Sequence, residues 1–277
     1  MEDLSARTVK QDQSWRPVAN LHSANSAGGS AGELARAPIL LHARPQWSDA
    51  SAEWRTGEFY KGLSPATMSE IESLAVPHCC PGTTVLFAEE QEPLNILFLL
   101  EGKVKLTMNS SGGKRLTLRI AGPGDVLGLA AVVSGSPYEI TAVAQFPCRV
   151  RAIPRKIFLD LLLRNPIAWQ NSARLLGSEC KRGCEHLRIL GFALTASMKL
   201  AMLLLQWCAE GQRDGLGVRL HCSLTHEEIG EYIGVSRETI SRSLINFRKL
   251  HLVEQHGSVF IIPRLRALEV YAGQFSW

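Results

Sequence analysis

The sequence lacks any long apolar segment. Nowhere in its 277 residues do about 18 apolar residues follow one another, so a membrane-spanning helix is not expected. Residues 1–20 mix acidic, basic and polar side chains, whereas a secretory signal needs an apolar core. We therefore expect a cytoplasmic protein, and the length favours either one large domain or a few small ones.

Cysteine is absent from residues 1–78, and the seven that follow belong to a chain without an export signal. This context predicts reduced, mostly buried thiols. Cys79 and Cys80 are adjacent, and Cys180 and Cys184 lie four residues apart, but two ligands do not make a metal site. No nucleophile, acid and base stand together, so an enzyme is not expected. The net charge of +4 permits nucleic-acid binding without arguing strongly for it.

The first 60 residues differ in composition from the rest. Small and polar residues from Ser23 to Gly32 predict a flexible tail over residues 1–60. Within it, Ile39–Arg44 and Trp47–Tyr60 are candidates to dock as short elements. The function of the tail does not follow from its composition.

Residues 61–160 carry the pattern of a β-rich unit. Leu63 to Leu74 predicts a short helix, with Ser64 or Thr67 as its cap. Short strand-like runs separated by glycine turns follow: Thr83–Ala88, Ile96–Leu100, Lys103–Met108, Leu116–Ile120, Thr141–Ala144 and Cys148–Ile153. Many short strands of this kind predict a sandwich or barrel.

A long helix is expected to begin at Asn165 and Pro166, because proline is tolerated in a first helical turn, and we assign the dimerisation helix to residues 161–192. Apolar or small residues recur at alternating spacings of four and three, including Trp169, Leu176, Cys180 and Leu187. This spacing predicts a coiled-coil seam between two copies, with packing of the helix on its own domain as the alternative. Cys180 would then face its symmetry mate. We hypothesise that oxidation crosslinks the dimer there; the alternative is a small buried hydrophobic side chain.

Residues 193–277 contain two helices joined by a tight turn. Thr225 and Glu228 form a capping-box pattern, and Gly234 can adopt the positive φ that a turn requires. Ser236 caps the second helix. Its predicted core stripe, at positions i, i+4 and i+7, consists of Ile240, Leu244 and Phe247.

The opposite side of the second helix carries polar side chains suited to DNA bases. Arginine can donate paired hydrogen bonds to guanine, and glutamate can accept from cytosine. The residues assigned to DNA binding are Ser236, Arg237, Glu238, Thr239, Ser241 and Arg242. Leu252–Ile262 predicts a β-hairpin wing that turns at Gly257 and Ser258. A solvated amphipathic helix in an α-helical domain is the alternative interpretation.

With these features assembled, the chain resembles the CRP/FNR family of bacterial regulators over residues 63–263. Three segments carry the resemblance: the helix-turn-helix of Glu228 to Arg242 (EIGEYIGVSRETISR), the strand pair of Leu97 to Leu106 (LFLLEGKVKL) and the turn of Pro123 to Gly128 (PGDVLG). The resemblance implies an α+β fold: a cyclic-nucleotide-binding-like sensor β-roll (61–160), a dimerisation helix (161–192) and a winged helix-turn-helix (193–277).

The resemblance also implies a transcription regulator that binds double-stranded DNA as a homodimer and contacts RNA polymerase. In the FNR-like branch Glu238, Ser241 and Arg242 correspond to recognition of TTGA, whereas Arg237 fits the TGTGA half-site of the CRP-like branch. Both half-sites therefore remain candidates. The alternative function is a binding module whose C-terminal unit makes protein contacts only.

The implied effector pocket departs from the family pattern. Leu129 follows Gly128 where cyclic-AMP binders carry Glu, and Tyr138 and Glu139 stand where they carry Arg and Ser. A carboxylate repels phosphate and no cation replaces the arginine, so cyclic AMP is not expected to bind in the usual way. An iron–sulfur cluster of the FNR type is also not expected, because the N-terminal cysteines are missing. The effector, or redox signal, stays open.

Overall fold

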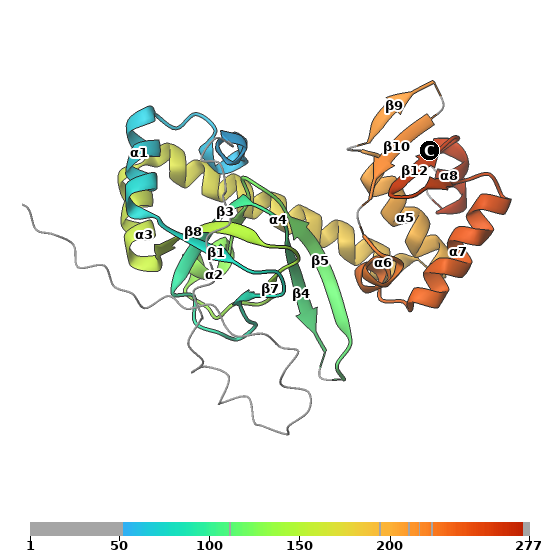
Figure 1. Ribbon diagram of the computed structural model, residues 1–277, viewed down its shortest axis with the longest axis horizontal. Helices are drawn as coiled ribbons and strands as arrows, with labels where there is room; N and C mark the ends of the chain where they lie inside the picture. Colours follow the sequence, from blue (N-terminus) through green and yellow to red (C-terminus); the bar gives the residue numbers. More distant parts are fainter. Residues whose placement is uncertain are drawn as a thin grey trace, which may run out of the picture.

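The computed structural model describes residues 52–110, 112–193, 195–209, 211–215, 217–222 and 224–273. A β-rich body and a helical C-terminal unit are connected by the long helix α4, Pro166–Phe192 (Figure 1). Tail residues 1–51, including the Ile39–Arg44 segment, lie outside the described residues. Within the ranges described, no helix has both the length and the apolar character needed to cross a membrane.

The β-rich body consists of two antiparallel four-stranded sheets. One sheet has the order β1 (Val76–Cys80), β8 (Cys148–Pro154), β3 (Asn95–Glu101) and β6 (Val126–Leu127). The other has the order β2 (Val85–Phe87), β7 (Thr141–Ala144), β4 (Val104–Asn109) and β5 (Arg115–Ala121). The expected β-rich unit is confirmed and is a sandwich, although β1 and β6 are strands that the sequence pattern did not indicate.

Strand β3 lies between two hydrophobic clusters, which explains its unbroken apolar sequence. Successive side chains of a strand point to opposite faces. Accordingly, Ile96 and Phe98 pack in the cluster beneath the helices, whereas Leu97 and Leu99 pack in the cluster between the sheets. All four are at most 2% exposed, so this strand anchors the β-rich body.

Helices cover one side of the sandwich. They are α1 (Pro65–Leu74), α2 (Leu129–Ser134) and α3 (Arg155–Arg164), preceded by the 3-10 turns η3 (Ala52–Thr56) and η4 (Glu58–Tyr60). Ser64 accepts a hydrogen bond from the Thr67 amide and caps α1, as the sequence indicated.

The expectation of a flexible tail up to residue 60 is wrong for its last residues, whereas the docking expected for Trp47–Tyr60 is found in its described part, residues 52–60. Trp54, Phe59 and Tyr60 are buried, and the Phe59 ring lies 5.3 Å from that of Phe98. Asn171 of α4 fixes the segment by donating to the carbonyl oxygens of Phe59 and Lys61 at 2.8 and 2.7 Å. The aromatic side chains belong to the core because they bury a large apolar surface, whatever the composition of the preceding tail.

The C-terminal unit combines four helices with a four-stranded sheet. The helices are α5 (Ala196–Cys208), α6 (His226–Ile233), α7 (Arg237–Lys249) and α8 (Leu265–Tyr271). The sheet has the order β11 (Glu254–His256), β12 (Val259–Ile262), β10 (Gly217–His221) and β9 (Gln212–Asp214). Strands β11 and β12 form the expected wing hairpin, and the α+β class with a winged helix-turn-helix is confirmed.

Candidate nucleic-acid interface

Helix α6 begins and ends on the residues that the sequence indicated. The Thr225 hydroxyl accepts from the Glu228 amide at 3.2 Å, and the Glu228 carboxylate accepts from the Thr225 amide at 2.9 Å. This reciprocal pair satisfies amides that a helix start leaves without partners. Gly234 ends the helix at a φ of 68°.

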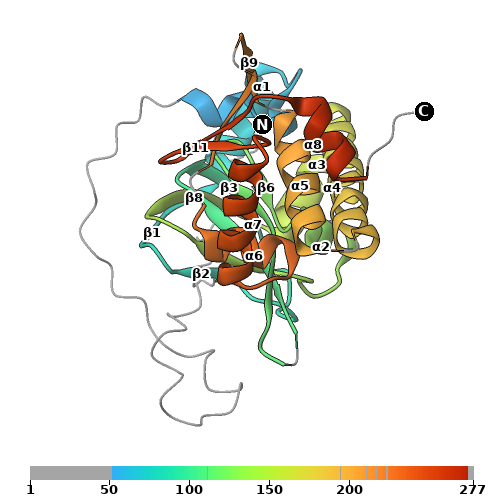
Figure 2. The same ribbon diagram turned by 90° about the vertical axis from the view of Figure 1, so that its right-hand side faces the viewer.

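The turn into α7 depends on close contact between backbones. A Cβ atom added to Gly230 would lie 2.5 Å from the Val235 carbonyl oxygen, so only glycine fits there. Ser236 then accepts a hydrogen bond from the Thr239 amide and caps α7. The stripe of Ile240, Leu244 and Phe247 is at most 1% exposed. Figure 2 looks onto this unit, with α6 and α7 beside each other in front of the sandwich.

The recognition face, defined as Arg237, Glu238, Ser241 and Arg242, lies on the solvent side of α7. Three of these side chains are exposed and Ser241 is half-buried. The Glu238 carboxylate accepts hydrogen bonds from the Glu238 amide and from Ser236, and these lower its pKa. The charges of Arg237 and Arg242 lower the pKa further, so the carboxylate is charged. The face therefore presents two cations, one anion and one hydroxyl group.

Two of the predicted DNA-binding residues also have contacts within the helix. The Thr239 hydroxyl lies 3.1 Å from that of Ser236 and accepts from Arg242 at 3.5 Å. Together with the Ser236 cap, these bonds hold the first turn of α7 and orient Arg242 along it.

His226 is a neighbour of this face that sequence analysis did not assign to it. Its Nδ1 lies 2.9 Å from the Ser241 hydroxyl, which joins the start of α6 to the middle of α7. Desolvation lowers the pKa of His226, and the charges of Arg237 and Arg248 lower it further. The neutral ring therefore positions Ser241. Only the fold reveals this, because the two residues are 15 positions apart.

A cavity of about 390 Å³ lies between the sandwich and α4. All four predicted pocket residues, Gly128, Leu129, Tyr138 and Glu139, line it. The Tyr138 hydroxyl donates its proton within the protein, to the Asn95 carbonyl oxygen at 2.8 Å. Burial raises the pKa of this hydroxyl to about 12, so it stays protonated.

The cavity contains cations that sequence analysis did not anticipate. Arg119 and Arg182 both line it, so the expectation that no cation replaces the family arginine is wrong for the cavity as a whole. Arg119 is already paired, however, at 2.8 Å from Asp125 and 3.7 Å from Glu179. Desolvation raises the pKa of Glu179, and the nearby arginines partly oppose that rise.

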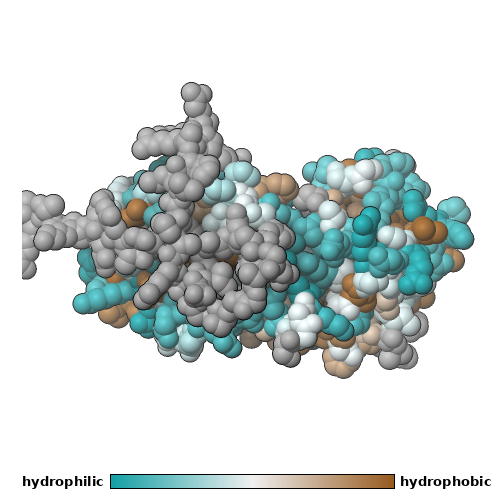
Figure 3. All heavy atoms as spheres, turned by 60° about the horizontal axis from the view of Figure 1, so that its bottom comes forward, coloured by the Kyte–Doolittle hydropathy of each residue, from teal (hydrophilic) through white to brown (hydrophobic). Residues whose placement is uncertain are grey.

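The predicted seam of α4 is mostly uncovered in the single chain. Trp169 is 51% and Leu187 67% exposed, while Leu176 is half-buried against the sensor core. Cys180 is exposed and lines the cavity, so its interpretation as a small buried side chain is wrong for the isolated chain. Elsewhere the visible surface of the C-terminal unit is mainly hydrophilic, with small hydrophobic patches (Figure 3).

Two family models match the chain. A cyclic nucleotide-binding domain covers residues 78–165, and a Crp-like helix-turn-helix domain covers residues 198–271. The first corresponds to the sandwich with α2 and α3. The second corresponds to the C-terminal unit with the recognition face.

Relatives and solved structures agree with these domains. A cyclic AMP receptor protein of Thermus thermophilus is 28% identical over 204 residues, covering 74% of this chain and 88% of the relative. A CRP-like cAMP-activated global transcriptional regulator of Mycobacterium tuberculosis is 24% identical, covering 73% and 91%. A CooA mutant of Carboxydothermus hydrogenoformans has a similar fold, with a TM-score of 0.66 and 20% identity, covering 73% of this chain and 90% of that chain. FixK2 of Bradyrhizobium japonicum also has a similar fold, with a TM-score of 0.61 and 21% identity, covering 71% of this chain and 96% of that chain.

Proposed function

Because this chain belongs to the CRP/FNR family of transcription regulators, we propose that it binds a near-palindromic promoter site as a homodimer and controls transcription through RNA polymerase. The recognition face carries this proposal. It lies on the exposed side of α7, a helix that Ser236 caps and whose opposite side is buried in the core. Its side chains can hydrogen-bond to base edges. In the helix-turn-helix class, the second helix enters the major groove.

Each side chain of the recognition face has a proposed role. Arg237 and Arg242 donate to guanine, and the charged Glu238 accepts from cytosine N4. Ser241, held by His226, serves a base or phosphate, while Ser236 and Thr239 lie at the helix start, where phosphate oxygens bind. TTGA and TGTGA are the candidate half-sites.

The homodimer is proposed from the uncovered seam of α4. Trp169 and Leu187 present apolar surface that a second copy of α4 would bury. A symmetric pair would place two recognition helices about 34 Å apart, the spacing of successive major grooves on one side of DNA.

The effector is proposed to bind in the cavity beside α4. The two curated relatives described above are named for cyclic AMP. This cavity, however, has Leu129 where cyclic-AMP binders carry Glu, and Tyr138 and Glu139 where they carry the phosphate-binding Arg and Ser. Of the two arginines that line the cavity, Arg119 is paired with two carboxylates, and Arg182 is exposed and interacts electrostatically with Glu179. We therefore expect isothermal titration calorimetry with cyclic AMP to give no tight binding; tight binding would refute this part of the proposal.

A mobility-shift assay tests DNA binding. Three duplexes are compared at one fixed salt concentration, because phosphate contacts make affinity strongly salt-dependent. They contain paired TTGA half-sites, paired TGTGA half-sites and a scrambled sequence of equal composition. We expect one palindrome to bind at least about tenfold more tightly than the scrambled duplex. Equal, weak binding to all three would favour a module that makes protein contacts only.

A further inference from the structure

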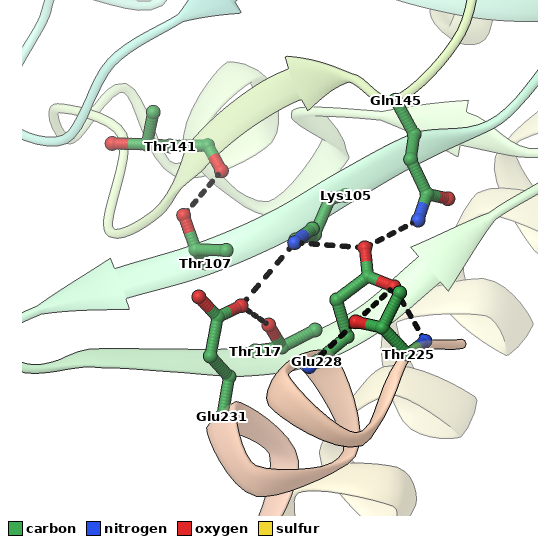
Figure 4. A network of polar contacts seen from close by, with 8 residues as sticks. All are labelled: Lys105, Thr107, Thr117, Thr141, Gln145, Thr225, Glu228 and Glu231. Atoms are coloured by element: carbon green, nitrogen blue, oxygen red, sulfur yellow. Dashed lines mark hydrogen bonds and ion pairs between the residues drawn. The ribbon is translucent and has the colours of Figure 1, made fainter. Parts of the chain in front are cut away.

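The sandwich and the C-terminal unit are joined by a polar contact between β4, β5 and α6 (Figure 4). Lys105 of β4 lies between two glutamates of α6. Its Nζ is 3.1 Å from Glu228 Oε1 and 3.2 Å from Glu231 Oε2. We call Lys105, Thr117, Gln145, Glu228 and Glu231 the interdomain latch.

The other two members of the latch complete its hydrogen bonding. The Thr117 hydroxyl donates to Glu231 Oε2 at 3.0 Å, and the Gln145 amide nitrogen donates to Glu228 Oε1 at 2.6 Å. The three charged side chains are only 16% to 19% exposed. Partly buried ion pairs with further hydrogen bonds are screened less than surface pairs, so this contact holds one defined geometry.

Glu228 links the latch to the start of the helix-turn-helix. Its Oε2 atom caps α6 by accepting from Thr225, while Oε1 accepts from Lys105 and Gln145. Burial alone would raise the pKa of Glu228, but hydrogen bonds from Thr225, Lys105 and Gln145 lower it below the usual value. The charged carboxylate therefore ties the first turn of α6 to the sandwich.

The strands that carry the latch also form a wall of the cavity. Leu106 follows Lys105 and Leu118 follows Thr117, and both leucines line the cavity. Neighbouring strand residues point to opposite faces, so the cavity and α6 lie on the two sides of the same strands. His186 makes a second connection, because it lines the cavity and its ring stacks on Tyr232 of α6, with centroids 6.0 Å apart.

We propose that Lys105 is a positioning residue for DNA recognition: its ion pairs with Glu228 and Glu231 hold α6 and α7 in the orientation that binds DNA. This inference rests on the proposed function. The recognition face stays exposed while the latch is closed, so the latch orients the face and does not cover it. A dimer must place two recognition faces at a fixed separation on DNA. Free movement of the C-terminal unit relative to the sandwich would have to be frozen on binding, so it would weaken the affinity for DNA.

Lys105→Met tests the latch in the full-length protein. Binding of the preferred palindrome is measured by fluorescence anisotropy at fixed salt, and small-angle X-ray scattering reports the arrangement of the two bodies. We expect about fivefold or greater loss of affinity, as for a typical coupling between sites, together with a broader distribution of interdomain distances. Lys114→Met is the matched control, because Lys114 is exposed on the same hairpin, outside the latch. It removes the same charge and should change affinity by less than about twofold.

Two further variants separate positioning from loss of fold. Glu231→Gln removes one ion pair while leaving Glu228 and its cap intact, and it should weaken binding in the same direction as Lys105→Met. Adding Glu231→Lys to Lys105→Glu restores opposite charges across the contact and should recover affinity relative to Lys105→Glu alone. If the two variants have the same far-UV circular dichroism, they are equally folded. A recovery of affinity between them would then reflect the orientation of the C-terminal unit, not its stability.

The outcomes distinguish the latch from the function on which it rests. Failure of the wild-type protein to prefer any palindrome would refute the proposed function. If the wild type binds its palindrome and folded Lys105→Met binds equally well or more tightly, the latch is refuted and the proposed function stands.

Discussion

At the scale of single residues, the two arginines of the recognition face, Arg237 and Arg242, differ in their place on the helix. Both are exposed on α7 and lie five positions apart, so we expect them to reach different base pairs of the proposed DNA site. Arg242 also bonds Thr239, whereas Arg237 stands at the very start of the helix. Because the resemblance associates Arg237 with TGTGA, we expect the choice between TTGA and TGTGA to depend on whether Arg237 contacts a base.

We predict that Arg237→Ala will discriminate between the two half-sites. If the preferred site is TGTGA, this variant should lose about 1–3 kcal/mol of binding free energy there, the value of a paired hydrogen bond to guanine. On TTGA its loss should be smaller, and the mobility-shift assay measures both. Lys249→Ala is the control, because Lys249 is exposed in the last turn of α7 and its loss should affect all duplexes alike. Equal loss from both palindromes would assign Arg237 to the phosphate backbone.

At the scale of elements, local signals predicted α6 and α7 closely because caps, glycine and core stripe lie within one short segment. The capping box at Thr225 and the cap at Ser236 fix where each helix begins. By contrast, β1 contains a proline and β6 has only two residues, so neither carries a strand pattern of its own. Both strands exist because they pair with β8 and β3, partners distant in the sequence.

The site shows the same division between local and distant information. Glu228 was recognisable as a capping residue, but its contact with Lys105 was not, because more than 120 residues separate them. Similarly, Arg119 could not be placed in the cavity before β5 and α4 were packed together. The local sequence pattern shows that Glu228 caps the start of α6. Only the tertiary fold shows that its second carboxylate oxygen binds Lys105 and Gln145.

The double role of Glu228 leads to a prediction about pH. A carboxyl group whose pKa is lower in the folded state stabilises the fold above its unfolded pKa, and this contribution disappears as pH falls through the folded value. The pKa of Glu228 is lowered from 4.5. Urea unfolding at pH 7 should therefore show Glu228→Gln to be less stable than wild type, because it loses the ion pair with Lys105.

The difference should begin to shrink as pH falls past about 4.5, where Glu228 of the unfolded chain takes up a proton, and it should disappear once pH has fallen through the lower pKa of the folded state. Glu227→Gln removes a charge from the same helical turn outside the latch, so its effect should depend less on pH in this range. A difference for Glu228→Gln that stays constant from pH 7 to 3 would contradict the prediction.

At the scale of the whole molecule, the uncovered side of α4 has the character of an interface. Burying a leucine side chain contributes roughly 1.5–3 kcal/mol, so several exposed apolar residues along one helix can drive association. We predict that Leu187→Glu will shift sedimentation from dimer to monomer. Leu163→Glu is the matched control, because Leu163 is 84% exposed on α3 and lies off the seam. Monomeric wild-type protein at micromolar concentration would contradict the dimer.

The exposed Cys180 provides an independent test of the same interface. In a parallel pair of α4 helices, each Cys180 would face its symmetry mate, and a disulfide needs Cα atoms about 4.4–6.8 Å apart. An azo oxidant such as diamide takes up the two protons and two electrons that two thiols release on forming one disulfide. We therefore predict a dimer band on a non-reducing gel, abolished by Cys180→Ser and retained in Cys184→Ser, whose cysteine is also exposed, one turn away. A wild-type protein that sediments as a dimer but stays uncrosslinked would place Cys180 off the contact line, and a band lost in Cys184→Ser instead would shift the seam by one turn.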